Sequence, residues 1–451
     1  MLLIRLLACA DPAPNPPVAG DTGPTEAPWT AELPSAADIA VDEGFTVRRA
    51  ITHLHSPWSH DACDGNPQPD GAPDLQCLAD LRAGLCATRV DAAFLSDHPA
   101  EAAFQPYADL FLAQPGDTPW PDAASQRANQ IACDDGHVVT WFPGIEDETM
   151  PLGLDRHVST DPAVNDATYN AGDPASVVAE AEAGALVFIA HTEQREPGWL
   201  AERQAVGLTG VELFNLHAMF DPDIRADFLG LDGLGWLADI GPFADPAATA
   251  EPDLLVLAVL GEQAPSIANW EALLALGPAV GIAGTDAHQN VLPVLMRDGE
   301  RGDSYRRMLR WFSNHLLVSQ GDPGDLEAAL AAGRSYVAFE ILGTPTGFSF
   351  HYGDVQMGGT GAPGGTLHVS CPTLLPGSPR GLDLPEITAT VFKDGVPWQT
   401  TCGDFPGVEP GVYRVRFDIV PHHLAPFLGT DPSPWIKVYP WIYGNAIRVG
   451  A

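Results

Sequence analysis

Histidines and carboxylates recur in this sequence where short apolar segments end. His53 and His55 close the first such segment, and Ser96-Asp97-His98 closes the second. Side chains two residues apart on an extended segment point to the same side, so the imidazoles of His53 and His55 can bind one metal ion. The pattern therefore indicates metal-ion chemistry.

Three further groups follow the same rule. Gly144-Ile145-Glu146 is followed eleven residues later by His157, Ala190 is followed by His191, and a late apolar run leads into Gly284-Thr285-Asp286-Ala287-His288. A lone histidine at a strand end is more often a hydrogen-bonded structural residue than a ligand. Five such groups in one chain favour a metal site over five separate structural roles.

Alternating strands and helices must position these groups. The expected helices are Leu75–Arg82, Ala123–Ala132, Ala175–Ala183, Trp270–Leu276 and residues 325–333. The expected strands are Val47–His53, Ala92–Asp97, Val138–Ile145, Ala185–Ala190, Gly210–Phe214 and Val280–Ala283. This alternation predicts an α/β domain with a parallel sheet, in which the carboxyl ends of the strands meet at one rim.

The pattern changes after about residue 336. Glycine and proline become frequent, and alternation with period two places Tyr413, Val415, Phe417 and Ile419 on one face of a strand. Lys393-Asp394-Gly395 has the composition of a hairpin turn. We therefore expect residues 336–451 to form a small antiparallel β-sandwich.

The N-terminus indicates export. Leu6-Leu7-Ala8-Cys9 resembles the lipobox of bacterial lipoproteins, in which the cysteine is lipidated. We expect residues 1–9 to be a signal segment of this type and residues 10–35, rich in proline and alanine, to be a tether. The predicted location is the bacterial cell envelope, either lipid-anchored or periplasmic; the alternative is a cytosolic protein with a frayed end.

Cysteine usage agrees with an oxidising compartment. Of seven cysteines, six remain when Cys9 is set aside, and an even number suits disulfides. Cys371 and Cys402 could pair across a strand-rich region, whereas Cys63, Cys77, Cys86 and Cys133 could pair in three ways. Buried free thiols are the alternative.

Composition excludes some classes of partner. The 451 residues carry a formal charge of −37, which disfavours nucleic acid and anionic lipid. The sequence contains no run of 18 apolar residues, so we expect contact with a membrane only through a lipid on Cys9.

The order of the motifs resembles the PHP (polymerase and histidinol phosphatase) superfamily of metal-dependent phosphoesterases. The H-x-H motif, the D-H motif, the G-I-E motif and the final G-T-D-A-H motif occur in order between about 53 and 288. Ala329–Val337 and the β-rich C-terminal region look like the carbaryl-hydrolase-like branch. The resemblance implies a distorted (β/α)7 barrel over residues 36–335, followed by the β-sandwich.

The same resemblance implies a ligand set for up to three ions. His53, His55, Glu146 and Asp286 would hold the first, and Glu146, His157 and His191 the second. His98, His288 and either His60 or Asp61 would hold the third, with Asp61 preferred. Two or three Zn²⁺, Mn²⁺ or Fe²⁺ ions suit these ligands, and Asp97 is expected to orient a ligand histidine.

This ligand set predicts a hydrolase acting on a small-molecule ester. A metal-activated hydroxide would attack a phosphoester, with Glu146, Asp286 and Arg195 as the catalytic residues. Arg156 and Arg195 could clamp a phosphate, although surface ion pairs are the preferred interpretation for both. The alternatives are a carboxylic or carbamate ester hydrolase with the same metals, and a non-catalytic surface-binding lipoprotein on a degenerate barrel. We expect His422 to be structural.

Overall fold

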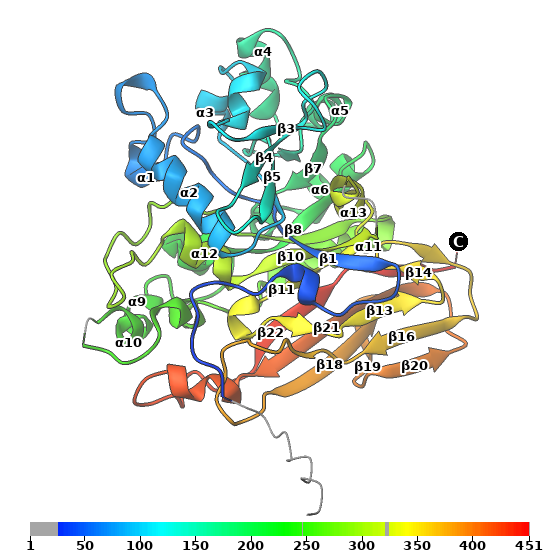
Figure 1. The fold of residues 1–451 in the computed structure, drawn as a ribbon. Coiled ribbons are helices and arrows are strands. Elements are labelled where there is room, and N and C mark those ends of the chain that lie inside the picture. The colour runs from blue at the N-terminus through cyan, green and yellow to red at the C-terminus, as the bar shows by residue number, and fades with distance from the viewer. Residues whose placement is uncertain (1–25, 246, 321–323, 451) are drawn as a thin grey trace, which may run out of the picture.

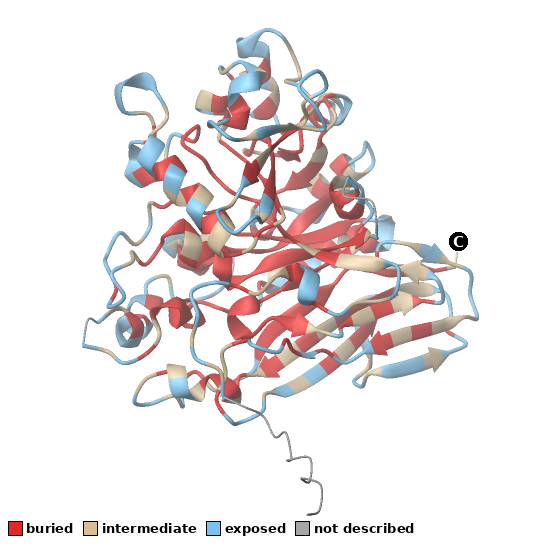
Figure 2. Cartoon of the chain, viewed as in Figure 1, coloured by how far each residue is buried: buried red, intermediate tan, exposed pale blue. Residues whose placement is uncertain are grey.

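The protein is described from a computed structural model, which covers residues 26–245, 247–320 and 324–450. The helices and most parallel strands form one part of the molecule, and the C-terminal strands lie against it (Figure 1). Buried residues, drawn red, occur in both parts (Figure 2), and one core cluster includes residues of both, among them Val47 and Phe417. The core therefore continues from the parallel strands into the C-terminal region.

All six predicted strands are present in two parallel groups. The first group is β1 (Phe45–Ile51), β2 (Ala92–Phe94) and β5 (Val138–Phe142). The second is β7 (Leu186–Ile189), β8 (Gly210–Asn215) and β9 (Val280–Gly284), with β6 (Met150–Leu152) antiparallel to β7.

Isolated bridges join these two groups. Leu54 pairs with Ala287, just beyond β1 and β9, and Gly144 pairs with Leu152, between β5 and β6. The pairing order β1, β2, β5, β6, β7, β8, β9 thus returns to β1, with single bridges at two of its junctions. The carboxyl ends of the parallel strands consequently face one side, while a barrel of the PHP type remains a prediction.

Two of the longer helices begin where the sequence provides a cap. Asp74 accepts hydrogen bonds from the first backbone N–H groups of α2 (Leu75–Ala87), and Asp173 does the same for α5 (Pro174–Glu182). The other helices are α1 (Ala62–Gly65), α3 (Pro99–Ala102), α4 (Pro162–Tyr169), α6 (Pro197–Gln204), α7 (Leu216–Phe220), α8 (Pro222–Asp227), α9 (Trp236–Asp239), α10 (Gly241–Ala244), α11 (Ala264–Leu276), α12 (Tyr305–Trp311) and α13 (Leu326–Ala331).

One predicted helix is wrong. The segment Ala123–Ala132 contains strand β4 (Ala128–Ala132), which pairs antiparallel with β5 and with β3 (Thr118–Trp120). Pairing at the free edge of β5 outweighs the helix propensity of the alanines, because a short segment gains more from sheet hydrogen bonds and burial than from propensity.

The C-terminal strands extend the sheet that contains β1. Strand β10 (Ser313–Ser319) pairs with β1 and with β11 (Ser335–Ala338), and β11 pairs with β22 (Tyr439–Gly444). The boundary predicted between 335 and 336 therefore falls inside a strand. The remaining strands are β12 (Pro345–Thr346), β13 (Ser349–Tyr352), β14 (Val355–Gln356), β15 (Thr360–Gly361), β16 (Thr366–Ser370), β17 (Thr373–Leu374), β18 (Glu386–Lys393), β19 (Val396–Gln399), β20 (Gly403–Pro406), β21 (Gly411–Val420) and β23 (Ile447–Val449).

A second sheet, in the order β14-β13-β16-β20, packs on these strands. The ring of Phe348 lies 5.6 Å from that of Phe417 and 4.7 Å from that of Tyr336, measured between centroids. Phe417 belongs to the predicted apolar face of β21, and that face is buried. The layer between the sheets is thus the sandwich-like core of the C-terminal region.

A buried ion pair ties β1 to the segment after β11. Arg49 donates from Nε and Nη2 to the two carboxylate oxygens of Glu340, each at 2.7 Å, and neither side chain is exposed. The charges of a desolvated pair must be matched, because an unpaired buried charge costs several kcal/mol. This pairing fixes the C-terminal region against the parallel strands.

Six cysteines are paired in the structure. The disulfides are Cys63–Cys77, Cys86–Cys133 and Cys371–Cys402. Cys9 and the predicted signal segment lie outside the described residues. Within the described residues, no helix is long and apolar enough to cross a membrane.

The predicted tether is wrong for its last ten residues. Leu33 is buried, and Trp29 donates from Nε1 to Asp253 Oδ2 at 3.0 Å while its ring contacts Phe427. These large apolar side chains provide enough buried surface to hold residues 26–35 against the domain. The rest of the predicted tether lies outside the described residues.

Candidate metal centre

Ligand-type side chains from five separate segments meet at the carboxyl ends of the parallel strands. His53 and His55 follow β1, His98 follows β2, Glu146 follows β5, His191 follows β7, and Asp286 and His288 follow β9. The Nε2 atoms of His53 and His55 lie 3.1 Å apart, and each is 3.3 Å from Asp286 Oδ1. The fold thus brings together ligand-type side chains that lie as far apart in the sequence as His53 and His288.

Two groups of these residues have the spacing of a metal site. The Asp61 cluster consists of His55, Asp61, His98 and His288, and the Glu146 cluster consists of His53, His55 and Glu146. In each cluster, one ligand atom per residue lies within 4.8 Å of the others. His55 belongs to both, so the clusters are adjacent.

His191 and Asp286 adjoin the Glu146 cluster. His191 Nε2 is 3.2 Å from Asp286 Oδ2 and 3.9 Å from Glu146 Oε1. Both His191 and Asp286 have positive φ angles, 49° each, in the left-handed region that non-glycine residues rarely adopt. Such strain is typical of functional sites, where packing holds a side chain in place.

The choice between His60 and Asp61 is clear in this geometry. Asp61 Oδ2 lies 3.3 Å from His288 Nε2 and 3.7 Å from His98 Nε2. The side chain of His60 is 54% exposed and faces Glu101 at 3.7 Å. Asp61, rather than His60, therefore places its side chain next to His98 and His288.

Hydrogen bonds fix the ring orientation of four histidines. His98 Nδ1 lies 3.0 Å from the carbonyl oxygen of Glu146, and His288 Nδ1 lies 2.9 Å from that of Asp286. A carbonyl oxygen only accepts, so both Nδ1 atoms carry the proton. His53 Nδ1 meets Glu212 Oε1 at 2.7 Å, and His55 Nδ1 meets Ser59 Oγ at 2.7 Å.

With the proton on Nδ1, the Nε2 atoms of His98 and His288 each have a free lone pair, and they face Asp61 Oδ2 at 3.7 and 3.3 Å. Such nitrogen lone pairs and a carboxylate oxygen repel one another unless a cation lies between them. His288 Nε2 and Asp61 Oδ1 are also buried, and neither has a hydrogen-bond partner among the described residues. The donor set therefore fits divalent metal ions, which satisfy buried polar atoms of this kind.

Burial and charge shift the pKa values of the cluster in both directions. Burial lowers the pKa of His53, but the charges of Asp286 and Glu212 raise it well above the ordinary value. Burial and the charge of His288 hold the pKa of His55 well below its ordinary value. Burial raises the pKa of Glu146. Neighbouring groups whose pKa values are strongly shifted, some upward and some downward, are typical of functional sites.

Three residues predicted for the site contact residues outside it. Both ring nitrogens of His157 are engaged elsewhere, with the carbonyl oxygen of Gln105 at 3.0 Å and the hydroxyl of Tyr169 at 3.2 Å. Arg195 pairs with Glu148 at 2.6 Å. The exposed Arg156 donates to the carbonyl oxygen of Glu182.

The role expected for Asp97 is also wrong. Its carboxylate accepts from the backbone N–H of Ser56 at 2.6 Å and from the Ser56 hydroxyl at 2.8 Å, rather than from a ligand histidine. Asp97 therefore holds the segment after β1, because Ser56 directly follows His55.

Glu212 was not predicted. Besides binding His53, its carboxylate accepts from the backbone N–H of His191 at 3.0 Å and from Asn215 Nδ2 at 2.9 Å. A signal was present in the sequence: Glu212 is the one charged residue in the apolar segment Gly210–Phe214. A buried carboxylate inside a strand needs partners, and here they are residues of the centre.

Arginines neutralise a third cluster, which consists of carboxylate residues only. Asp253, Asp298 and Glu300 lie close enough together to hold an ion. Arg306 pairs with Asp253 at 2.7 Å, and Arg307 pairs with Asp298 at 2.9 Å. These guanidinium groups supply the positive charge, so the group serves as a salt-bridge network.

Comparisons with known proteins add little. No protein-family model matches the chain, and no curated protein matches it. A solved structure, the crystal structure of PsfC from Pseudomonas syringae PB-5123, matches with a TM-score of 0.33 and 13% identity, over 60% of this chain and 82% of that chain. A similarity of this size carries no argument about fold or function.

Proposed function

We propose that the protein is a metal-dependent hydrolase of the PHP type that cleaves a phosphoester in a small molecule. The observation that carries the proposal is the convergence of five histidines and three carboxylates, of which four histidines have Nδ1 held by a hydrogen-bond partner. Two or three Zn²⁺, Mn²⁺ or Fe²⁺ ions suit this donor set.

Bound divalent ions would supply a water molecule of lowered pKa and polarise the substrate oxygen. The residues of the centre would position the ions and leave one side of the centre open to substrate. The side chains of His53 and His55 are not exposed, whereas those of His98 and His191 are 22% and 20% exposed and that of Asp61 is 35% exposed. Substrate therefore approaches from the side of His98, His191 and Asp61, and the other side excludes water.

A specific observation favours a second candidate, the hydrolysis of a carboxylic or carbamate ester by the same centre. Arg195, the residue expected to clamp a phosphate, has its charge balanced by Glu148. A neutral ester needs no such clamp. In either reaction Glu146 and Asp286 act as acidic residues that hold the centre together, since each contacts more than one histidine.

We also propose that the protein works in the bacterial cell envelope. The three disulfides support an oxidising compartment. A lipid on Cys9 remains part of this proposal, and a non-catalytic surface-binding lipoprotein is its alternative.

Metal analysis and a substrate panel test the proposal. Protein purified without chelator should contain at least two ions per chain, and less than one ion would favour the binding lipoprotein. Rates with p-nitrophenyl phosphate, bis(p-nitrophenyl) phosphate and p-nitrophenyl acetate separate the two hydrolase candidates.

Variants then test the site itself. His55→Ala and Glu146→Ala should lose metal and turnover while remaining folded. His422→Ala is the control, because its half-buried ring faces Glu386, far along the chain from the centre. Unchanged rates in both site variants would overturn the assignment.

A further inference from the structure

Asp61 stands on the least regular segment of the candidate metal centre. The other ligand-type residues lie within four residues of the end of a strand, whereas Asp61 precedes the four-residue helix α1. Inside α1, Cys63 and Asp64 have positive φ angles of 55° and 57°. The residues from 64 to 76 that follow are mostly exposed. Local structure alone therefore does little to keep Asp61 in place.

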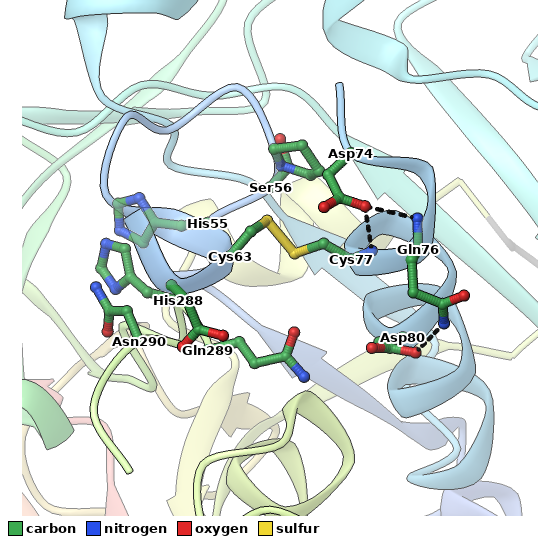
Figure 3. Close-up of a disulfide and its surroundings, with 12 residues drawn as sticks. His55, Ser56, Cys63, Asp74, Gln76, Cys77, Asp80, His288, Gln289 and Asn290 are labelled. Atoms are coloured by element: carbon green, nitrogen blue, oxygen red, sulfur yellow. Dashed lines mark hydrogen bonds between the residues drawn. A yellow bond between two sulfur atoms is a disulfide. The ribbon is translucent and has the colours of Figure 1, made fainter. Parts of the chain in front are cut away.

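Backbone contacts tie this segment to the one that carries His288. The N–H of Cys63 donates to the carbonyl oxygen of His288 at 2.9 Å, and the N–H of Asp64 donates to that of Gln289 at 3.1 Å. Asn290 donates from Nδ2 to the carbonyl oxygen of Asp61 at 2.8 Å. Figure 3 shows Cys63 beside His288, Gln289 and Asn290.

The Cys63–Cys77 disulfide connects the same segment to a rigid support. Cys77 lies in the first turn of α2, whose start is capped by Asp74 (Figure 3). Helix α2 packs closely on α12: a side chain on Gly84 would come within 2.8 Å of the backbone nitrogen of Arg306. Both cysteines are buried.

The support leads back to the centre through Tyr305. This buried residue of α12 donates from its hydroxyl to the carbonyl oxygen of His55 at 3.0 Å, and that of His288 lies at 3.3 Å. The same hydroxyl lies 3.8 Å from Cys77 Sγ. Helices α2 and α12 and the disulfide thus together support the segments that carry Asp61, His55 and His288.

We propose that the Cys63–Cys77 disulfide is a positioning device on which ion binding at the Asp61 cluster depends. The inference rests on the proposed metal-dependent function. Loss of the bond frees the Asp61 segment from α2, so the Asp61 cluster loses its carboxylate. The Glu146 cluster has no residue on this segment and keeps its ion.

The test compares two disulfide-deleted variants of the full chain. Cys63→Ala/Cys77→Ala is matched by Cys371→Ala/Cys402→Ala, which removes a disulfide of the C-terminal region. Zn²⁺ is titrated into metal-free protein, and bound ions are counted. We expect the first variant to bind one ion fewer than the wild type, or to bind its weakest ion at least tenfold less tightly, and the second to match the wild type.

If the first variant does not fold, the wild type is reduced instead with a water-soluble phosphine. The phosphine takes up the oxygen of one water molecule and becomes phosphine oxide, while the disulfide takes up that water's two protons and becomes two thiols; alkylation then identifies the opened bonds. Molecules with Cys63 and Cys77 alkylated should have lost one ion. Unchanged ion number and affinity, in the variant or in those molecules, would overturn the inference.

The two proposals fail in different ways. A wild type that binds less than one ion overturns the proposed function. A wild type that binds two or more ions, together with a Cys63→Ala/Cys77→Ala variant that binds them equally well, overturns only the role of the disulfide.

Discussion

Glu212 Oε1 lies 2.7 Å from His53 Nδ1, and both side chains are buried. The other carboxylate oxygen of Glu212 accepts from the backbone N–H of His191. One carboxylate on β8 therefore holds the ligand-type residues that follow two other strands, β1 and β7. Such a partner fixes the ring orientation and raises the basicity of the nitrogen that faces the metal.

Glu212→Gln should weaken metal binding about 10- to 100-fold while leaving the chain folded. Glutamine has the shape of glutamate but lacks its charge and can accept at only one oxygen. Competition with a coloured chelator measures the affinity. Glu386→Gln, a change at an exposed carboxylate, is the control. Equal affinity in both variants would contradict this role.

His157→Ala should leave the ion content unchanged, whereas His191→Ala should lower it. Both ring nitrogens of His157 have hydrogen-bond partners outside the centre, while His191 Nε2 faces Asp286 and Glu146. Elemental analysis of the two purified variants decides between the geometry and the resemblance, which implies that His157 is a ligand. Loss of an ion from His157→Ala would favour the resemblance.

Gly284→Ala should destabilise the protein by about 1–3 kcal/mol and reduce metal binding. A Cβ at this position would overlap Glu212 Oε1 and lie 3.0 Å from the Cβ of His53. Gly198→Ala is the matched control, since no atom of the described part of the chain lies within 4 Å of the added atom. Thermal unfolding and chelator competition check both effects, and similar behaviour of the two variants would refute the close packing at Gly284.

Glu180→Gln should make stability less dependent on pH. Burial raises the pKa of Glu180 from 4.5 to about 8, although a hydrogen bond from Thr149 lowers it. In the wild type, the folded state keeps this proton as the unfolded state loses it. The contribution of protonated Glu180 to the free energy of unfolding is thus complete below pH 4.5 and is lost as the pH rises through about 8.

Urea unfolding at pH 5 and pH 8 measures this effect. The free energy of unfolding of the wild type, relative to that of Glu180→Gln, should fall by roughly 2–4 kcal/mol between the two pH values. A constant difference would show that Glu180 is ionised in the folded protein near neutral pH.

The strand positions and most of the candidate site could be predicted from the sequence. A buried parallel strand is a short apolar run, and residues just beyond it must lie at the sheet edge, so His53, His55, His98, Glu146, His191, Asp286 and His288 were identifiable without coordinates. The error at Ala123–Ala132 arose because alanine favours a helix locally while β5 offered an unpaired edge.

Ring orientation and long-range contact required the tertiary structure. His157 and His191 look equivalent along the chain, yet only His191 reaches Asp286, because Gln105 and Tyr169 hold His157 elsewhere. The sequence by itself determined which residue types follow the strands, since that depends on local periodicity. The folded chain alone decided which side chains meet, since contacts such as Glu212 with His53 join residues 159 positions apart.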